Sequence, residues 1–356
     1  LYVCFLIDFA VLHYLGMHGE VTDSLFDHLP NPEHEGANFT LRGIEETFRI
    51  IPWSGDGKYT VGEVIGEPSE ENTEDLCLNT RYIAQKQLKQ LEDFGYQLIS
   101  AFEMEQVFLD QKTLKPLYKG SDFCSSFVMF KQEKLLFDIK KNLSAYGIPI
   151  TSMGNELSPG QFEFTMKPSY GIDCADQCFR GREALREICH QHGVMCTYMT
   201  APFKDAIASG YHFNHSLWTA TGEAAFHDPS DRDKMSELAR YWIGGLQKHA
   251  RGMTALLCPT VNCYHRLNDS WGITYNGWSL GNRLHTFRMK TGEPGDTYLE
   301  NRLPSSASNP YLVLAATVAA GLDGIQKKID PITSDKTKKG LQKLPLTLEE
   351  ALDALE

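Results

Sequence analysis

Three features are missing from this sequence, and each absence excludes a class of protein. The nine cysteines form no Cys-x-x-Cys pair, which disfavours a zinc ribbon, and their odd number disfavours a secreted disulfide framework. Basic residues are not in excess: 34 Lys and Arg stand against 46 Asp and Glu, and the net charge of −12 opposes binding to nucleic acid or anionic lipid. No apolar run is long enough to span a bilayer. We expect a cytoplasmic protein with reduced thiols and with no nucleic-acid or membrane partner.

What is present predicts a folded chain of two domains. With 356 residues, 42% of them hydrophobic, the chain exceeds the roughly 250–300 residues that a single core supports. Turn signals and short apolar runs predict a small strand-rich domain over 1–79, and a larger domain follows over 80–356. Because residue 1 is leucine and not methionine, we expect the chain to be a fragment of a longer one.

The larger domain alternates helical and extended patterns, which indicates the α+β class. Apolar residues at helical spacing predict helices that end before a glycine, where a left-handed residue is favoured. The Asn309-Pro310 pair predicts the start of a last helix, whose apolar run we expect to be buried on every side. The predicted helices cover 80–94, 133–146, 175–192, 233–257 and a segment from 310 that includes the apolar run 311–322.

A first pair of carboxylates, Glu103 and Glu105, follows a strand-like segment. In an extended strand alternate side chains share a face, so the two carboxylates project together. Like charges held this close favour a divalent cation between them. Taken alone, the pair also fits the polar face of an exposed edge strand.

A second group lies on either side of a Ser-Pro-Gly turn. Strict alternation after the turn places Gln161 and Glu163 on one face, beside Glu156 across the turn. Two more carboxylates therefore converge. The alternative is a hairpin with a polar outer face.

The remaining polar side chains stand in further alternating runs. His212 and Asn214 share one face of the run 209–216, and Glu300 and Arg302 point the same way from another. A lone strand histidine is more often structural than a ligand, although histidine is also the commonest metal-ligand side chain.

Three more arginines, Arg266, Arg283 and Arg288, precede Arg302 in one acid-poor stretch. Arg283 and Arg288 are five residues apart, so a regular strand would point them to opposite faces. Both could reach one ligand only through a bulge or a turn.

Taken in order, these motifs resemble those of the class I glutamine synthetase family from about Phe48 to the end of the chain. Any one of them is weak, whereas the whole series in register is specific. The tail from Tyr311 to Gly324 is most similar to the lengsin branch of that family. The motifs are Pro52-Trp53, Thr80-Arg81, Glu103-x-Glu105, Glu156 with Gly160-Gln161-x-Glu163, Ser209-Gly210-x-His212, Asn262-x-Tyr264-x-Arg266-Leu267, Asn282-Arg283, and Glu300-x-Arg302-x-Pro304 with Ala307-x-Asn309-Pro310-Tyr311-Leu312.

The resemblance implies an ATP-dependent ligase that joins glutamate to ammonia or another amine through a γ-glutamyl phosphate. It implies a small β-grasp N-terminal domain, atypical before about residue 45, and an antiparallel-sheet catalytic domain with packed helices, truncated at its C-terminus. Homo-oligomeric stacked rings with sites between subunits would follow. By position, the resemblance implies two Mg²⁺ or Mn²⁺ ions, one held by Glu105, Glu156 and Glu163 and the other by Glu103, His212 and Glu300. It implies that substrate glutamate is bound by Arg266, Arg302, Ala208 and Gly210, and ATP by Arg283, Arg288, Asn214 and Ser216. Arg266, Arg283 and Arg302 would assist catalysis.

Three positions depart from the family pattern. Ile207-Ala208-Ser209-Gly210 stands where the family has Asn-Gly-Ser-Gly, His265 stands in place of a lysine, and Gly272 replaces the expected flap glutamate. The flap residue helps to remove a proton from ammonium and shields the intermediate, so its loss affects amine selection and water exclusion. The alternative function is therefore a lengsin-like, catalytically inactive homo-oligomer with a structural or chaperone-like role.

Overall fold

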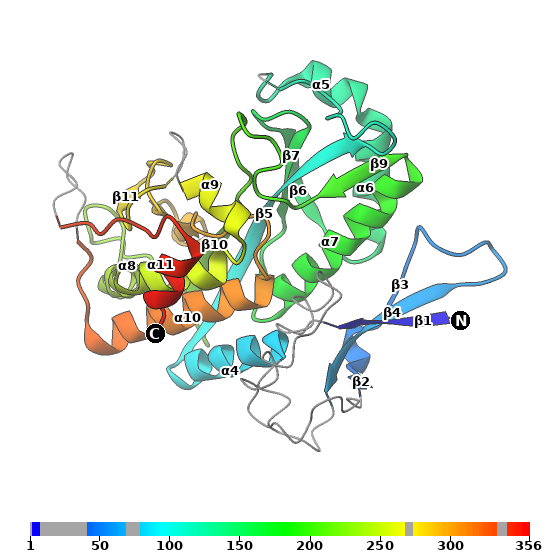
Figure 1. The fold of residues 1–356 in the computed structure, drawn as a ribbon. Helices are drawn as coiled ribbons and strands as arrows, with labels where there is room; N and C mark the ends of the chain where they lie inside the picture. The colour runs from blue at the N-terminus through cyan, green and yellow to red at the C-terminus, as the bar shows by residue number, and fades with distance from the viewer. Residues whose placement is uncertain (1, 8–40, 69–78, 121, 268–272, 333–339) are drawn as a thin grey trace, which may run out of the picture. The chain divides into compact units, whose positions relative to one another are not determined.

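The computed structural model describes residues 2–7, 41–68, 79–120, 122–267, 273–332 and 340–356 (Figure 1). The chain divides into two compact units, Leu1–Lys86 and Gln87–Glu356. Gly272, the flap position, lies outside the described residues.

The first unit is built on a small sheet centred on β4 (Val61–Pro68). The strand pairs in parallel with β1 (Tyr2–Ile7) and antiparallel with β2 (Leu41–Gly43) and β3 (Arg49–Ile50). A short 3-10 helix, η2 (Glu45–Thr47), packs on β4, and the Thr47 hydroxyl accepts the Ile65 backbone N–H at 2.9 Å.

The second unit holds a nine-stranded sheet in the order β11-β12-β13-β10-β5-β7-β6, with β8 and β9 also paired to β5. All pairs are antiparallel except β11 with β12. The long strand β5 runs through the middle of this unit (Figure 1). The strands are β5 (Tyr96–Asp110), β6 (Ile150–Asn155), β7 (Gln161–Met166), β8 (Ser169–Tyr170), β9 (Val194–Thr197), β10 (Tyr211–Thr219), β11 (Trp278–Leu280), β12 (Phe287–Lys290) and β13 (Tyr298–Asn301).

Helices cover this sheet and form the core with it. Buried aromatic side chains from one face of the central strands, among them Phe102, Phe164 and Phe213, pack beneath the helices. The helical elements are α4 (Thr80–Asp93), α5 (Ser126–Lys131), α6 (Glu133–Ala145), α7 (Asp173–Gln191), α8 (Glu237–Leu257), η3 (Val261–Cys263), α9 (Tyr264–Leu267), η4 (Pro294–Asp296), α10 (Pro310–Lys327) and α11 (Leu348–Asp353).

The sequence located the long helices and their ends. Gly95, Gly147 and Gly193 follow α4, α6 and α7 with φ values of +96°, +90° and +68°, as predicted for left-handed C-terminal residues. Helix α8 begins at Glu237 and not at 233, because Ser236 caps it by accepting the Ala239 N–H. The α+β class, with a small N-terminal sheet and a larger, mainly antiparallel sheet covered by helices, is confirmed.

One expectation about α10 is wrong. Its apolar run is not buried on every side, because Ala319 is exposed and Ala316 is half-buried. Both side chains line a groove of about 480 Å³ between α8, α10 and the end of α11. Within the described residues, no helix combines the length and apolarity needed to cross a membrane.

Candidate metal centre

The register of the central strands brings the predicted polar residues onto one face of the sheet. Glu103 on β5 pairs with His212 on β10, and Glu105 on β5 pairs with Glu163 on β7. Farther along β10, Asn214 pairs with Glu300 on β13. Because alternate residues of a strand share a face, these pairs lie side by side on the face opposite the aromatic core.

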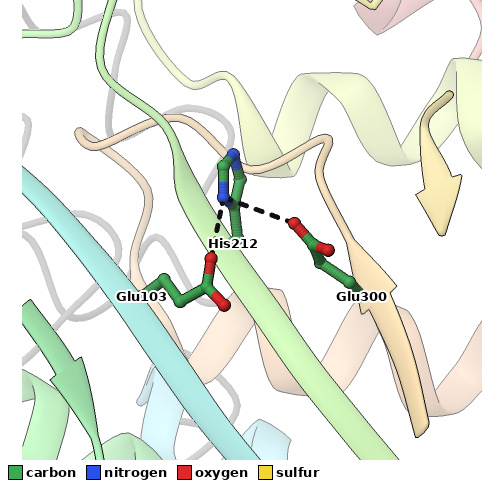
Figure 2. Close-up of side chains that lie close together, drawn as sticks. All are labelled: Glu103, His212 and Glu300. Carbon is green, nitrogen blue, oxygen red and sulfur yellow. Dashed lines mark hydrogen bonds and ion pairs between the residues drawn. The ribbon is translucent and has the colours of Figure 1, made fainter. Parts of the chain in front are cut away.

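One cluster consists of Glu103, His212 and Glu300 (Figure 2). The imidazole Nδ1 of His212 lies 3.1 Å from Glu103 Oε2 and 3.6 Å from Glu300 Oε1. Three potential ligand atoms, one from each residue, lie within 4.8 Å of one another. Glu103 is further fixed by the Asn214 side-chain amide, which donates to its other oxygen at 2.9 Å.

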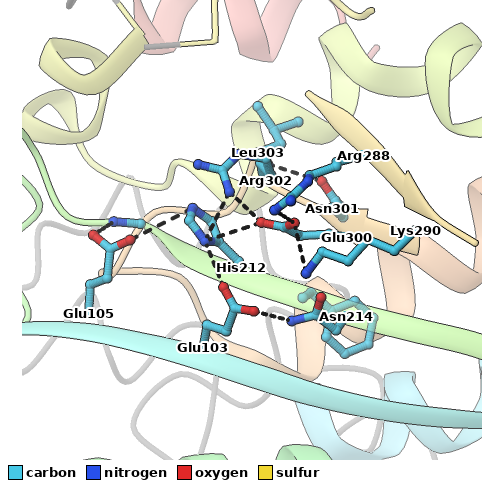
Figure 3. Close-up of polar contacts among 12 residues, drawn as sticks. Glu103, Glu105, His212, Asn214, Arg288, Lys290, Glu300, Asn301, Arg302 and Leu303 are labelled. Atoms are coloured by element: carbon cyan, nitrogen blue, oxygen red, sulfur yellow. Dashed lines mark hydrogen bonds and ion pairs between the residues drawn. The ribbon is translucent and has the colours of Figure 1, made fainter. Parts of the chain in front are cut away.

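A second cluster shares the same histidine. Glu105, Glu163 and His212 also offer ligand atoms within 4.8 Å of one another, and His212 Nε2 lies 3.7 Å from Glu105 Oε1. Figure 3 shows the imidazole between Glu105 on one side and Glu103 and Glu300 on the other. Both nitrogens of one ring therefore face carboxylates.

Glu156 is placed beside this second cluster by the turn between β6 and β7. Its backbone N–H donates to the Gln161 carbonyl at 2.8 Å, which closes the hairpin. Burial, with Glu105 next, raises the Glu156 pKa to about 7, and the guanidinium of Arg283 acts in the opposite direction. Burial, again with Glu105 next, raises the pKa of Glu163 to about 9. Both pKa values are raised because the site concentrates negative charge away from water.

Glu300 has the opposite environment. Burial disfavours its charge, but His212, Arg302 and Lys290 outweigh burial and lower its pKa to about 2. Its side chain is 1% exposed and receives ion pairs from Arg288 at 3.1 Å, from Lys290 at 3.3 Å and from Arg302. Among the ion pairs of the described residues, Glu300 is the one member of the predicted ligand set that engages a lysine or arginine.

The four predicted arginines lie in different surroundings. Arg266, on α9, is buried, and its guanidinium donates to the carbonyls of Leu303 at 3.0 Å and Arg302 at 2.7 Å. Arg302 and Arg288 point at Glu300 (Figure 3). Arg283 is exposed in the turn before β12, outside the strand, so the strand argument that separated it from Arg288 does not apply.

The positions predicted to bind glutamate, Ala208 and Gly210, lie just before β10, and Asn214 and Ser216, predicted to bind ATP, lie on β10. Gly210 donates its N–H to Glu105 Oε2 at 2.8 Å, and the neighbouring Ala208 is buried. A Cβ on Gly210 would lie only 2.8 Å from His212 Nε2 and 2.9 Å from Arg266 Nη2, which explains glycine here. Ser216 follows His212 and Asn214 on one face of β10, and its hydroxyl accepts the Trp218 indole N–H.

Two contributors were not predicted. Lys290 contacts Glu300, and period-two alternation from Arg288 would have shown that it shares that face. Gln161 was predicted to share a face with Glu163, but its contact with Glu105 was not predicted: Gln161 is 1% exposed and donates to Glu105 at 2.9 Å. No local pattern reveals that contact, because it depends on the pairing of β5 with β7.

The donor set suits a hard divalent cation. Carboxylate oxygens with one imidazole are ligands for Mg²⁺ and Mn²⁺, whereas thiolates, which soft metals prefer, are absent from both clusters. The raised pKa values of Glu156 and Glu163 show carboxylates gathered with too little positive charge. The residues of both clusters therefore fit a divalent cation of this kind.

The comparisons with known proteins show the family of the chain. The model of the glutamine synthetase catalytic domain matches residues 78–356, and the chain belongs to the glutamine synthetase family. A solved structure described as a novel glutamine synthase homolog superposes with a TM-score of 0.80 at 25% identity, covering 90% of this chain and 75% of the other.

Curated relatives include proteins of different names. Lengsin of Rattus norvegicus is 30% identical over 92% of this chain and 61% of its own length, so the chain spans about three-fifths of that relative. Glutamine synthetase of Thermotoga maritima is 30% identical over 90% of this chain and 76% of its own. Gamma-glutamylanilide synthase of an Acinetobacter species is 29% identical over 87% and 66%.

Proposed function

We propose that this protein is an ATP-dependent ligase that couples glutamate to ammonia or another amine through a γ-glutamyl phosphate. One observation carries the proposal: four carboxylates and an imidazole converge on one face of the central sheet, with Glu156 coupled to Glu105 beside them and arginines at the border, in a chain of this family. We further infer that residues 80–356 form the catalytic domain and that the setting is cytoplasmic.

The proposed reaction brings two anions together, the γ-phosphate of ATP and the side-chain carboxylate of glutamate. Transfer between them needs positive charge placed along the line of attack. Arg302 and Arg266 are assigned to the glutamate and its developing acyl phosphate, with Ala208 and Gly210 lining the same site. Arg283 and Arg288, with Asn214 and Ser216, are assigned to ATP. The amine then attacks the acyl phosphate and phosphate leaves.

Two divalent cations, when bound, would supply charge stabilisation for the transferred phosphoryl group. Glu105, Glu156 and Glu163 are assigned to one ion, and Glu103, His212 and Glu300 to the other. The grouping of Glu103 with Glu300 on one side of His212, and of Glu105 with Glu163 on the other, supports this division. His212, Arg302 and Lys290 keep Glu300 ionised, and therefore ready to act as a ligand.

The names of two relatives point to different amine substrates. Relatives named for anilide and isopropylamine products or substrates show that members of this family act on amines other than ammonia. In this chain, Gly272 stands where the flap glutamate is expected, which removes a group suited to deprotonate ammonium. An amine that arrives unprotonated fits this change.

A second function is supported by different observations. Lengsin is among the relatives and matches over 92% of this chain, and the Asn-Gly-Ser-Gly loop and flap glutamate of the resemblance are replaced. A catalytically inactive homo-oligomer with a structural role is therefore the alternative. In either case we propose assembly as a homo-oligomer of stacked rings, with sites completed between subunits.

A phosphate-release assay separates the two functions. Purified protein is incubated with ATP, glutamate and Mg²⁺, with ammonia and a series of alkyl and aryl amines supplied one at a time. A ligase releases phosphate only when glutamate and an amine are both present, and Glu300→Gln lowers the rate at least about 100-fold. The Cys174→Ser variant, in the buried core, serves as the matched control and retains the rate. Mn²⁺ binding without release for any amine supports the inactive oligomer.

A further inference from the structure

Gln161 occupies the junction of three segments of the site. It is the first residue of β7, five residues from Glu156 and two from Glu163, and its side chain is buried. It is paired with Val107 on β5, which lies two residues past Glu105. Its amide therefore lies between the hairpin that carries two carboxylates and the strand that carries a third.

The amide of Gln161 uses all its hydrogen-bonding groups. Its Oε1 accepts the Ser158 backbone N–H at 3.2 Å, and its Nε2 donates to Glu105 Oε2 at 2.9 Å and to Ser209 Oγ at 3.1 Å. The reverse orientation of the amide would set two oxygens against each other at Glu105 and two N–H groups against each other at Ser158, so the network fixes one orientation.

Glu105 is held by this contact and by its neighbour. The Gly210 N–H donates to the same Oε2 at 2.8 Å, so that one oxygen is committed and Oε1 is left facing His212 Nε2 at 3.7 Å. A second link joins the same segments, since the Ser158 hydroxyl donates to the Ile207 carbonyl at 2.5 Å. The segment 207–210 is thus tied to the β6–β7 hairpin at two points.

We propose that Gln161 is a positioning residue that holds Glu105 and the segment Ser209–Gly210 in register with the hairpin of Glu156 and Glu163. The inference rests on the proposed function, in which Glu105 binds an ion and Gly210 lines the substrate site. Partners that orient a metal ligand affect affinity although they do not touch the metal. Loss of the amide leaves Glu105 free to turn toward other rotamers.

The neighbouring strand offers a matched control in Gln106. It follows Glu105 on β5, points to the opposite face and is 0% exposed, and neither of its side-chain polar atoms has a hydrogen-bond partner within the described structure. Replacing either glutamine by methionine keeps the length of the side chain and removes the amide. Only Gln161→Met breaks a contact to the site.

Two measurements on the full chain test the proposal. Mn²⁺ affinity is measured by the signal of free Mn²⁺ in electron paramagnetic resonance, and backbone exchange of the Gly210 amide is followed by mass spectrometry without metal. We expect Gln161→Met to weaken Mn²⁺ binding by roughly 10–100-fold. We also expect the Gly210 amide to exchange at least about 10-fold faster, because its acceptor Glu105 is released. Gln106→Met should match the parent in both.

The outcomes separate this inference from the proposed function. Parent-like affinity and parent-like exchange in a folded Gln161→Met protein overturn the inference and leave the function standing. A parent protein that binds no Mn²⁺ removes the proposed function, and the metal-free exchange of Gly210 then decides the inference alone. If Gln161→Met does not fold, Gln161→Asn takes its place, because an amide one methylene shorter cannot span Ser158, Glu105 and Ser209 together and should show the same two changes.

Discussion

At the scale of single residues, the site favours the charged form of one carboxyl group, that of Glu300, and disfavours the charged form of another, that of Glu163. Burial and the neighbouring carboxylates Glu105, Glu103 and Glu156 all disfavour the charged form of Glu163. Glu300 forms ion pairs with Arg288, Lys290 and Arg302, and these cations favour its charged form. Removing the charge by substitution with glutamine should therefore change the stability of the metal-free protein in opposite directions.

For the first prediction, the free energy of unfolding is measured by urea titration at pH 7.5 in EDTA. Glu163→Gln should stabilise by roughly 1–3 kcal/mol, because each unit of pKa shift is worth about 1.4 kcal/mol and the folded site disfavours the ionised acid. Glu300→Gln should destabilise by about 3 kcal/mol, because three cations lose their partner. Changes of the same sign in both variants would contradict the charge distribution described above.

The second prediction concerns pH. Folded-state pKa values raised to about 7 for Glu156 and about 9 for Glu163 add stability to the metal-free protein below pH 4.5, and this stability is lost as pH rises through those values. A cation binds the ionised forms, so its effect runs the other way. The rise in melting temperature produced by Mn²⁺ should grow from pH 6 to pH 9. A constant rise across this range would show that neither carboxyl titrates with the ion.

At the scale of elements, α8 and α10 pack so closely that glycine is required on both. A Cβ on Gly245 would overlap the Ala320 carbonyl oxygen, and one on Gly324 would overlap the Tyr241 carbonyl oxygen. Close packing of this kind leaves no flexible side chain to move aside. The contact fixes α10, and α10 follows directly from the segment that carries Glu300 and Arg302.

The third prediction compares two helical glycines. Gly245→Ala should destabilise the protein by at least about 3 kcal/mol, because backbone must shift to admit the methyl group. Gly181→Ala, in α7, meets its nearest atom at 3.7 Å and should stabilise by about 0.5–1 kcal/mol through helix propensity. Both are measured by denaturant unfolding. Equal effects of the two substitutions would mean that α8 and α10 do not approach as described.

The elements show what a sequence reveals and what it leaves open. Period-two alternation predicted that Glu103 and Glu105 share a face, and the structure confirms it, because alternation is a local property of a strand. The contacts of Gln161 and Lys290 were missed because they depend on which strands pair and in which register. The exposed side of α10 was not predicted for the same reason. The apolar sequence of a helix does not determine which of its faces other elements cover. The ligand set itself was predicted by resemblance, and its metal-binding role stays a prediction.

At the scale of the whole molecule, the chain divides into two units, and the six predicted ligands all lie in the second, Gln87–Glu356. A cation that binds only the folded form stabilises it by an amount set by its concentration relative to Kd, about 2.7 kcal/mol at 100 times Kd. For a unit of this size, that amount corresponds to a rise in melting temperature of roughly 5–10 °C. The rise should disappear in Glu156→Ala and Glu300→Ala.

The fourth prediction concerns which strands the bound cation stabilises. Hydrogen exchange with saturating Mn²⁺ should slow in peptides from β5, β7, β10 and β13, whose strands carry the ligands and pair with one another. Peptides from β4, in the first unit, should exchange at the same rate with and without the ion. Cys174→Ser, whose buried thiol lies in α7 away from the carboxylates, should show the parent's pattern. A ligand slows local opening only where the opened state loses its binding site. Protection of β4 alone would therefore place the ion outside the central sheet, and protection of neither unit would show that these strands bind no ion.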